Sequence, residues 1–326
     1  MGIAGATGYA GQELVALLAR HSGVRLVAAM SSSADSAARP LPRLAKTWDG
    51  QVEPLDTTRL ACETDVTFLA VPEQAAATLA PPLVNAGVRV IDLSGAFRIR
   101  DVGARLHWYP ATTAMPEGAA YGLTELFRDE VKGARLIANP GCYPTAALLS
   151  LLPLNRAGLL DAKAGVIIDA KSGISGAGRA PSDRTHFSEN HGSVSAYGVF
   201  KHRHVAEMEQ ELGATVTFVP HLVPLDRGIL ETIYVTTAAG TTAQQIADTF
   251  DQAYAHEPFV RVVGDALPEI KHVAWTNFCD IGWRFDPDTR RLVIVACLDN
   301  LVKGAAGQAL QNFNVVCGLD ERTGLQ

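Results

Sequence analysis

Short apolar runs alternate with amphipathic segments in the first part of the chain. The apolar runs lie at 2–5, 24–30, 66–71, 88–93 and 135–139, and helical patterns occupy 12–21 and 73–85. Continuous apolar runs are typical of strands that are buried on both faces. Their alternation with helices predicts an α/β fold with a parallel, doubly wound sheet of the Rossmann type. The pair Pro81-Pro82 predicts a kink or break in the second helix.

The pattern changes beyond Pro153. Strand-like runs lie at 165–170, 215–219 and 230–237, and 278–285 with 291–298 flank a hairpin turn. An amphipathic helix is predicted at 242–255, where Thr242 and Gln245 form a capping-box pattern. We therefore expect an α+β second domain with a mixed, partly antiparallel sheet. A last helix at 303–316 should return to the first domain, which gives predicted boundaries of 1–141, 142–302 and 303–326.

Composition narrows the class of protein. The chain has 326 residues, 48% hydrophobic and 19% charged, which suits two globular domains. A net charge of −6 and a pI near 5.8 disfavour nucleic acid and membrane surfaces as partners. The start of the chain carries no signal-peptide pattern, and its first strand is short, as expected if the start is truncated. The five cysteines are scattered without a C-x-x-C pair, which predicts a reducing cytoplasm and no metal site.

The segment from Asn139 to Thr145, Asn-Pro-Gly-Cys-Tyr-Pro-Thr, lies between a predicted strand and a predicted helix. Cys142 is thereby placed beside the first helical N–H groups, where the helix dipole lowers the pKa of a thiol. Pro144 suits a first helical turn. We therefore predict that Cys142 is a nucleophilic thiolate; the alternative is a buried, inert cysteine.

A glycine-rich turn follows the first strand and opens the first helix. Its residues are Gly5, Ala6, Thr7, Gly8, Tyr9, Ala10 and Gly11. This context predicts a dinucleotide-binding loop; the alternative is a tight turn with close helix–strand packing. The second strand ends in Ser31 and Ser32, with Arg39 a few residues on, where NAD-binding proteins usually have an acidic residue. We infer NADP(H), because serines and an arginine suit a 2′-phosphate.

Further polar clusters are candidates for the rest of the site. The stretch 201–207 contains His202 and Glu207, and it is either a source of a general base or a charged helix start. The stretch 169–179 is a second glycine-rich loop that either cradles an anion or is a mobile surface loop. Ser94 and Arg98 follow a parallel strand at the edge where ligands bind, and could hold a phosphate.

A thiolate, a nicotinamide cofactor, a histidine and arginines point to one chemistry. The thiolate attacks an acyl group and expels a leaving group, and hydride then reduces the thioacyl enzyme to an aldehyde. The reverse direction oxidises an aldehyde through a thiohemiacetal. We therefore expect an oxidoreductase acting on a small acyl compound.

The stretches 5–11, 139–145, 201–212, 220–229 and 299–314 together resemble the N-acetyl-γ-glutamyl-phosphate reductases of arginine biosynthesis, in the semialdehyde-dehydrogenase superfamily. The resemblance implies NADPH-dependent reduction of N-acetyl-γ-glutamyl phosphate to the semialdehyde with release of phosphate. It implies an NADP-binding domain, a catalytic and dimerisation domain, and a homodimer or homotetramer.

The same resemblance implies roles for particular residues. Cys142 would be the nucleophile, and His202, assisted by Glu207, would give a proton to the aldehyde oxygen as the intermediate collapses. Residues lining the cofactor and the cleft would be Ser172, Gly173 and Gly176. The predicted substrate-binding residues are Ser94, Arg98, Asn139 and Arg227.

Two other functions compete with this one. A reductase of carrier-bound aminoadipyl phosphate, from lysine biosynthesis, shares the cysteine chemistry. It should need a positively charged surface at the entrance of its active site, because its carrier protein is acidic. The net charge of −6 disfavours it. A non-catalytic NADP-binding redox sensor would oxidise Cys142 instead of acylating it.

Overall fold

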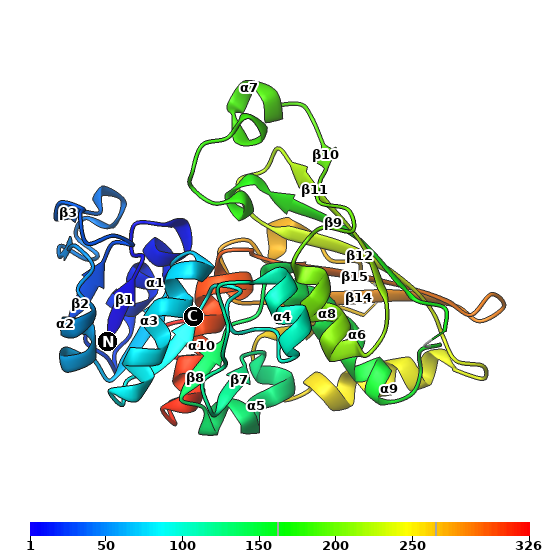
Figure 1. Cartoon of the computed structure of the whole chain (residues 1–326). Coiled ribbons are helices and arrows are strands. Elements are labelled where there is room, and N and C mark those ends of the chain that lie inside the picture. Colours follow the sequence, from blue (N-terminus) through cyan, green and yellow to red (C-terminus); the bar gives the residue numbers. More distant parts are fainter. Residues whose placement is uncertain (162, 265) are drawn as a thin grey trace. The chain divides into compact units, whose positions relative to one another are not determined.

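Figure 1 shows a computed structural model of the chain, which describes residues 1–161, 163–264 and 266–326. The chain divides into two compact units. One comprises Met1–Gly141 with Ala305–Gln326, and the other comprises Cys142–Gly304. Within the described ranges, no helix is both long and apolar enough to cross a membrane.

The first unit contains a six-stranded sheet in the order β2-β1-β5-β6-β8-β7, and every pair in it is parallel. Its strands are β1 (Gly2–Ala4), β2 (Ala28–Met30), β5 (Val66–Leu69), β6 (Arg89–Asp92), β7 (Ala119–Tyr121) and β8 (Leu136–Ala138). The helices are α1 (Tyr9–Arg20), α2 (Thr57–Glu63), α3 (Glu73–Asn85), α4 (Val102–Trp108), α5 (Thr124–Gly133) and α10 (Gly307–Val316). A small ladder of β3 (Arg39–Pro40) and β4 (Gln51–Val52), with the 3₁₀ turn η1 (Pro42–Leu44), follows β2.

Apolar side chains cover both faces of this sheet. On one face, Leu14 of α1 and Phe313 of α10 belong to the same core as Phe68 of β5. On the other face, Leu83 of α3 packs in a core with Leu69. Neighbouring residues of β5 thus point into two different cores, which explains the continuous apolar runs in the sequence. The predicted doubly wound fold is confirmed.

Pro81 and Pro82 do not break the second helix, so that part of the prediction was wrong. Helix α3 continues through Pro81 and Pro82. A proline removes the hydrogen bond to the carbonyl four residues earlier. Those carbonyls belong to Ala77 and Thr78, which lie on the partly exposed side of the helix where water can take the bond. Strand β7 was missed, because its three residues are too few to show a periodicity.

The second unit contains a mixed seven-stranded sheet in the order β10-β11-β9-β12-β15-β14-β13. Its strands are β9 (Val166–Gly173), β10 (Ser195–Ala196), β11 (Val216–Val223), β12 (Ile229–Thr236), β13 (Val260–Val262), β14 (Cys279–Asp286) and β15 (Arg291–Leu298). The helices are α6 (Cys142–Arg156), α7 (Phe187–Asn190), α8 (His204–Leu212) and α9 (Ala243–Tyr254). Short turns are η2 (Ile174–Ala177), η3 (Asp183–Thr185), η4 (Ile270–His272) and a π-helical turn, η5 (Val302–Ala306), that leads into α10.

Three local predictions for this unit are confirmed. Strands β14 and β15 form an antiparallel hairpin. Thr242 and Gln245 form the capping box that starts α9. The sheet is mixed, since β9 pairs in parallel with β11 and antiparallel with β12.

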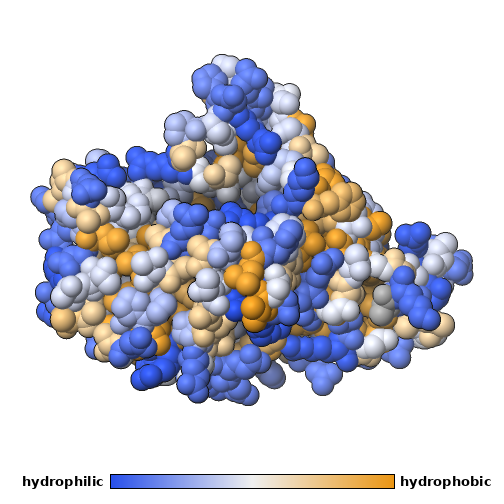
Figure 2. Space-filling model, in the orientation of Figure 1, coloured by the Kyte–Doolittle hydropathy of each residue, from blue (hydrophilic) through white to orange (hydrophobic). Residues whose placement is uncertain are grey.

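The two faces of the second sheet differ. Strand β12 alternates between buried and partly exposed side chains, and its buried members lie on the side covered by α6. On the opposite face, Ile167 and Tyr234 are cross-strand neighbours that are 46% and 37% exposed. The segment that carries α7 extends away from this sheet and is mostly hydrophilic on the visible side (Figures 1 and 2).

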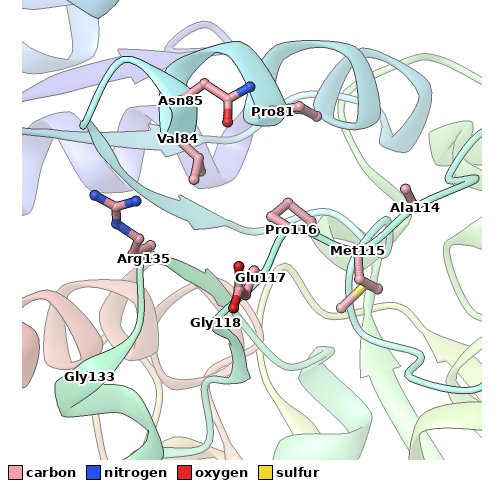
Figure 3. A pocket seen from close by; sticks show the side chains of 10 residues that line it. All are labelled: Pro81, Val84, Asn85, Ala114, Met115, Pro116, Glu117, Gly118, Gly133 and Arg135. Carbon is pink, nitrogen blue, oxygen red and sulfur yellow. The ribbon is translucent and has the colours of Figure 1, made fainter.

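A hollow of about 490 Å³ lies in the first unit, at the edge where β7 and β8 begin (Figure 3). Val84, Met115 and Pro116 form apolar parts of its wall, and Asn85, Glu117 and Arg135 line it with polar groups. Ligands of open α/β sheets bind at the carboxyl ends of the strands. This hollow lies at the amino ends, and no predicted site residue lines it.

Candidate active site

Cys142 is the first residue of α6, four residues beyond the last position of β8. Its side chain is half-buried, and Pro144 lies in the first turn, so the predicted strand-to-helix setting is confirmed. The helix dipole favours a thiolate at this position. Burial instead raises the pKa of the Cys297 thiol, which lies within β15. The local structure therefore supports Cys142 as the reactive cysteine.

Gly304, in the π-helical turn η5, packs directly on the cysteine. A Cβ atom at this position would lie 2.7 Å from the Cβ atom of Cys142. Real Cβ atoms do not approach so closely, so this position requires glycine. π-helical turns are rare and often occur at functional sites. No local pattern indicates this contact, because the two residues are far apart in the chain.

His202 lies just before α8, in a cage of aromatic rings. The centroid of its ring is 5.7 Å from that of Tyr143, 5.6 Å from Tyr197 and 5.3 Å from Phe218. The ring of His204 lies 4.7 Å away. Tyr143 is the neighbour of Cys142 in α6, so the packing fixes the histidine in the region of the cysteine.

Burial in this cage, together with the charge of Arg203, lowers the pKa of His202 from 6.5 to about 4. The imidazole is therefore neutral at physiological pH. The backbone N–H of His204 donates to Nδ1 of His202 at 3.2 Å. The proton of the neutral ring is then on Nε2, so His202 presents an N–H donor.

Glu207 is fully buried in α8, and its carboxylate lies 3.8 Å from Nε2 of His204. Glu207 therefore contacts His204, and its predicted assistance to His202 remains a prediction. The reason is helix geometry, since positions 204 and 207 are one turn apart and share a face. His204 was not singled out from the sequence.

Two tyrosines extend the cluster around Cys142. The hydroxyls of Tyr143 and Tyr197 lie 3.0 Å apart. Burial raises the pKa of Tyr197 to about 12 and raises the pKa of Tyr143 further, so both hydroxyls keep their protons. Tyr143 also hydrogen bonds with Ser172, which the sequence had assigned to the cleft. The tyrosines were missed because nothing local in the sequence marks them.

The second glycine-rich stretch is ordered. Strand β9 runs through Ser172 to Gly173, and η2 follows directly. A Cβ atom on Gly173 would lie 2.7 Å from the carbonyl oxygen of Asp226, and one on Gly176 would lie 2.8 Å from Oγ of Ser172. Gly173 therefore permits close packing of the 226–228 loop, and Gly176 permits close packing on Ser172.

Arg227 lies in that loop, with a side chain only 4% exposed. Its Nη1 atom is 3.5 Å from Oδ1 of Asp299, and its Nε atom is 3.9 Å from Oδ2 of Asp226. Asp299 is fully buried. The arginine is thus a permanent positive charge held in place within the unit that contains Cys142.

In the first unit, the glycine loop has the geometry of an anion site. Gly5 has a φ of +91°, and a Cβ atom on it would lie 2.1 Å from the carbonyl oxygen of Ala70. Gly8 is the N-cap of α1 and offers no side chain to cap it, so the first N–H groups of the helix, beginning at Tyr9, suit a pyrophosphate. Thr7 and Gly11 complete the loop, and Gly11 touches the carbonyl oxygen of Gly5.

The end of β2 carries the predicted ribose-phosphate residues. Ser32 and Arg39 are exposed there, whereas the hydroxyl of Ser31 donates to the carbonyl oxygen of Ser33 at 2.7 Å and so shapes the loop. The fold brings Glu53 beside this strand end, which the sequence did not reveal. Its carboxylate pairs with Arg59, which offsets the charge of Glu53 beside the tip of β2.

Ser94 and Arg98 lie after β6, as predicted, around a carboxyl group that the sequence analysis overlooked. Asp92 is fully buried, and burial raises its pKa to about 6. Ser94 donates to it from its backbone N–H at 3.0 Å and from Oγ at 2.8 Å. Arg98 is 7% exposed and donates to the carbonyl oxygen of Leu93 at 2.8 Å. Ser94 thus holds Asp92 in this structure.

Asn139 makes hydrogen bonds within the first unit, and its predicted contact with substrate remains a prediction. Its side chain is fully buried. It donates to the carbonyl oxygen of Ala305 at 3.1 Å and accepts from the amide of Asn312 at 3.0 Å. The amide therefore connects the end of β8 to the π-helical turn η5 and to the middle of α10.

Two family models match the chain. Residues 1–134 match "Semialdehyde dehydrogenase, NAD binding domain", and residues 142–300 match "Semialdehyde dehydrogenase, dimerisation domain". Among curated proteins, N-acetyl-gamma-glutamyl-phosphate reductase of Symbiobacterium thermophilum is 47% identical over 100% of this chain and 97% of its own length. The enzyme of the same name from Desulforapulum autotrophicum is 44% identical over 99% of this chain and 97% of its own length.

Solved structures agree on the fold. Aspartate semialdehyde dehydrogenase II from Vibrio cholerae superposes with a TM-score of 0.74 at 18% identity, over 97% of this chain and 98% of that one. Aspartate semialdehyde dehydrogenase with NADP from Candida albicans gives 0.71 at 16% identity, over 97% of both chains. At such identities the likeness establishes the fold alone.

Proposed function

This chain belongs to the N-acetyl-γ-glutamyl-phosphate reductase family of semialdehyde dehydrogenases, and on that premise we propose that it reduces N-acetyl-γ-glutamyl phosphate to N-acetylglutamate 5-semialdehyde and phosphate. The cofactor is NADPH and the pathway is arginine biosynthesis. The observation that carries the chemistry is the position of Cys142 at the start of α6, beside the cage that holds His202.

Cys142 forms the covalent intermediate. Its thiolate attacks the acyl carbon, the carbon–oxygen bond to the phosphate breaks, and a thioester remains on Sγ. When bound, NADPH supplies the hydride that reduces the thioester carbon. The resulting thiohemiacetal oxygen is negative, and its collapse expels the Cys142 thiolate and releases the aldehyde.

His202 stabilises the oxygen that becomes negative in both steps. Its Nε2–H is a hydrogen-bond donor in the neutral ring, as set by the hydrogen bond that Nδ1 accepts from His204. A negative oxygen nearby favours the charged imidazolium. The ring therefore takes up a proton from solvent while that charge exists and loses it again when the charge is gone, and Glu207 supports it through His204.

The residues of the first unit suit NADP(H). The uncapped N-terminus of α1 and the close turn at Gly5 offer backbone N–H groups to the pyrophosphate. Exposed Ser32 and Arg39 at the end of β2 suit the 2′-phosphate, and Arg59 removes the charge of Glu53 that would oppose it. Ser172, Gly173 and Gly176 remain our candidates for the nicotinamide side of the cleft.

The competing functions have less support. The curated relatives, at 42–47% identity over nearly the whole chain, all carry the arginine-pathway name. A carrier-bound substrate and a non-catalytic sensor are therefore not favoured. We place the protein in the cytoplasm, where its cysteines would stay reduced.

The first experiment follows NADPH absorbance in the reverse direction. Purified protein is mixed with N-acetylglutamate semialdehyde, NADP and phosphate, and a parallel sample omits phosphate. We expect steady NADPH formation that requires phosphate, and a much slower reaction with NAD in place of NADP. No turnover by a protein that binds NADPH would contradict the substrate assignment and favour the carrier-bound substrate or the sensor.

We propose that the chain forms a dimer through the open face of the seven-stranded sheet. The family model over residues 142–300 is described as a dimerisation domain, and the exposed pair Ile167–Tyr234 lies on this face. Ile167→Asp should convert the dimer to monomer in light scattering, because a charge would be buried at the interface. Leu106→Asp, at an exposed leucine of the first unit, is the control. An unchanged mass for Ile167→Asp would place the interface elsewhere.

A further inference from the structure

Trp275, between η4 and β14, has an unusual backbone conformation. Its φ is +69°, in the left-handed region that bulky residues rarely adopt. Its side chain is nevertheless 59% exposed, so burial of the indole does not explain the strain. The backbone is held by a hydrogen bond from its N–H to Oδ2 of Asp299 at 2.7 Å. Strain that persists in this way is often associated with function.

The indole of Trp275 covers Arg227. The central guanidinium carbon lies 3.6 Å from the centroid of the ring, which is a stacked cation–π contact. Arginine stacks well on aromatic faces because its planar charge is weakly hydrated. The contact leaves the arginine side chain 4% exposed. The ring thus covers one face of the guanidinium and limits its rotation.

Asp299 joins these two residues to the region of the nucleophile. Oδ1 of Asp299 lies 3.5 Å from Nη1 of Arg227 and accepts from the backbone N–H groups of Leu301 at 2.8 Å and Val302 at 3.0 Å. The π-helical turn begins at Val302 and contains Gly304, which packs on Cys142. One buried carboxylate therefore sets both the plane of the guanidinium and the turn beside the cysteine.

The shape of the guanidinium favours one kind of anion at Arg227. Asp299 and Asp226 both lie within 4.0 Å of the guanidinium and partly offset its charge. A phosphate dianion would feel about twice the repulsion from these aspartates and about twice the attraction to the guanidinium that a carboxylate feels, so geometry decides between them. A planar carboxylate matches the planar fork of an arginine.

We propose that Trp275 is a positioning residue that holds Arg227 in the plane required to bind the carboxylate of the substrate. This inference rests on the proposed function, since it takes the substrate to be an N-acylated amino acid with one free carboxylate and one reacting acyl group. The acyl phosphate is bound elsewhere in the site. In the reverse direction the carboxylate and the phosphate arrive on separate molecules, so their binding can be measured separately.

Trp275→Gly provides the test, because glycine tolerates a φ of +69° while the ring is lost. We expect the KM for N-acetylglutamate semialdehyde to rise about tenfold, with the KM for phosphate and the kcat within about twofold of wild type. The melting temperature should stay equal or rise. Trp275→Phe, which retains a ring, should keep the KM within about threefold. Calorimetric binding of the semialdehyde without NADP should weaken tenfold in Trp275→Gly.

Lys46→Gly is the matched control. Lys46 has a φ of +68° and donates its N–H to Asp49 at 2.8 Å, so the same strain is removed away from Arg227. Its KM values should equal those of wild type. An unchanged semialdehyde KM in Trp275→Gly, a rise in the phosphate KM instead, or a lowered melting temperature would overturn the inference. If the wild-type protein shows no turnover but Trp275→Gly still binds the semialdehyde tenfold more weakly than wild type does, only the proposed function is overturned.

Discussion

Cys142→Ser should abolish hydride transfer, with kcat lowered by at least about 10³-fold. A serine hydroxyl at this position is not ionised near neutral pH, and the helix dipole that favours a thiolate is too weak to ionise it. The measurement is phosphate-dependent NADPH formation. Because the variant changes one atom at the start of α6, the binding of NADPH by fluorescence should stay within about twofold of wild type.

Cys62→Ser is the matched control for this variant, since Cys62 is an exposed thiol in the first unit. Its rate should equal that of wild type. Wild-type turnover in Cys142→Ser would refute the nucleophile assignment. A loss of NADPH binding together with the rate would show that the substitution disturbs the fold, and the rate could then not be assigned to the thiol.

The second large effect is expected for His202→Asn. Asparagine keeps an N–H donor but cannot exchange a proton, so kcat should fall by about 10²- to 10⁴-fold while the KM for NADP is unchanged. The pH profile gives an independent readout. Because the pKa of His202 is lowered to about 4, its protonation should not produce an acid limb near pH 6.5 in wild-type kcat at saturating phosphate.

His204→Asn makes the same change two residues along the chain. We expect a smaller loss, of about tenfold or less, because His204 acts on His202 only through packing and the charge of Glu207. If His204→Asn costs as much as His202→Asn, or if a limb near pH 6.5 disappears in His202→Asn alone, the role assigned to His202, a neutral ring that exchanges a proton only with the charged intermediate, is wrong.

Local sequence patterns predicted the features that depend on neighbouring residues. The apolar runs predicted the parallel sheet, because strands that are buried on both faces are apolar along their whole length. The capping-box pattern of Thr242 and Gln245 predicted the start of α9. Pro144 and the preceding strand predicted that Cys142 lies at the start of α6. Each of these depends on contacts within a few residues.

Features that depend on contacts between distant residues could not be predicted. The contact between Gly304 and Cys142, and the hydroxyl pair of Tyr143 and Tyr197, join residues from separate elements. Asn139 gives a third example of such contacts. It lies in the motif around the cysteine, but its amide is used by the turn and helix near the end of the chain.

The central claim is that Cys142 carries the acyl group. The most direct test mixes the protein with N-acetylglutamate semialdehyde and NADP in the absence of phosphate, and measures NADPH and the intact mass. The account predicts a burst of about one NADPH per active site and a gain of one N-acetylglutamyl group on the peptide that contains Cys142, both discharged by phosphate. No burst, or an acyl group on another cysteine such as Cys62, would contradict it.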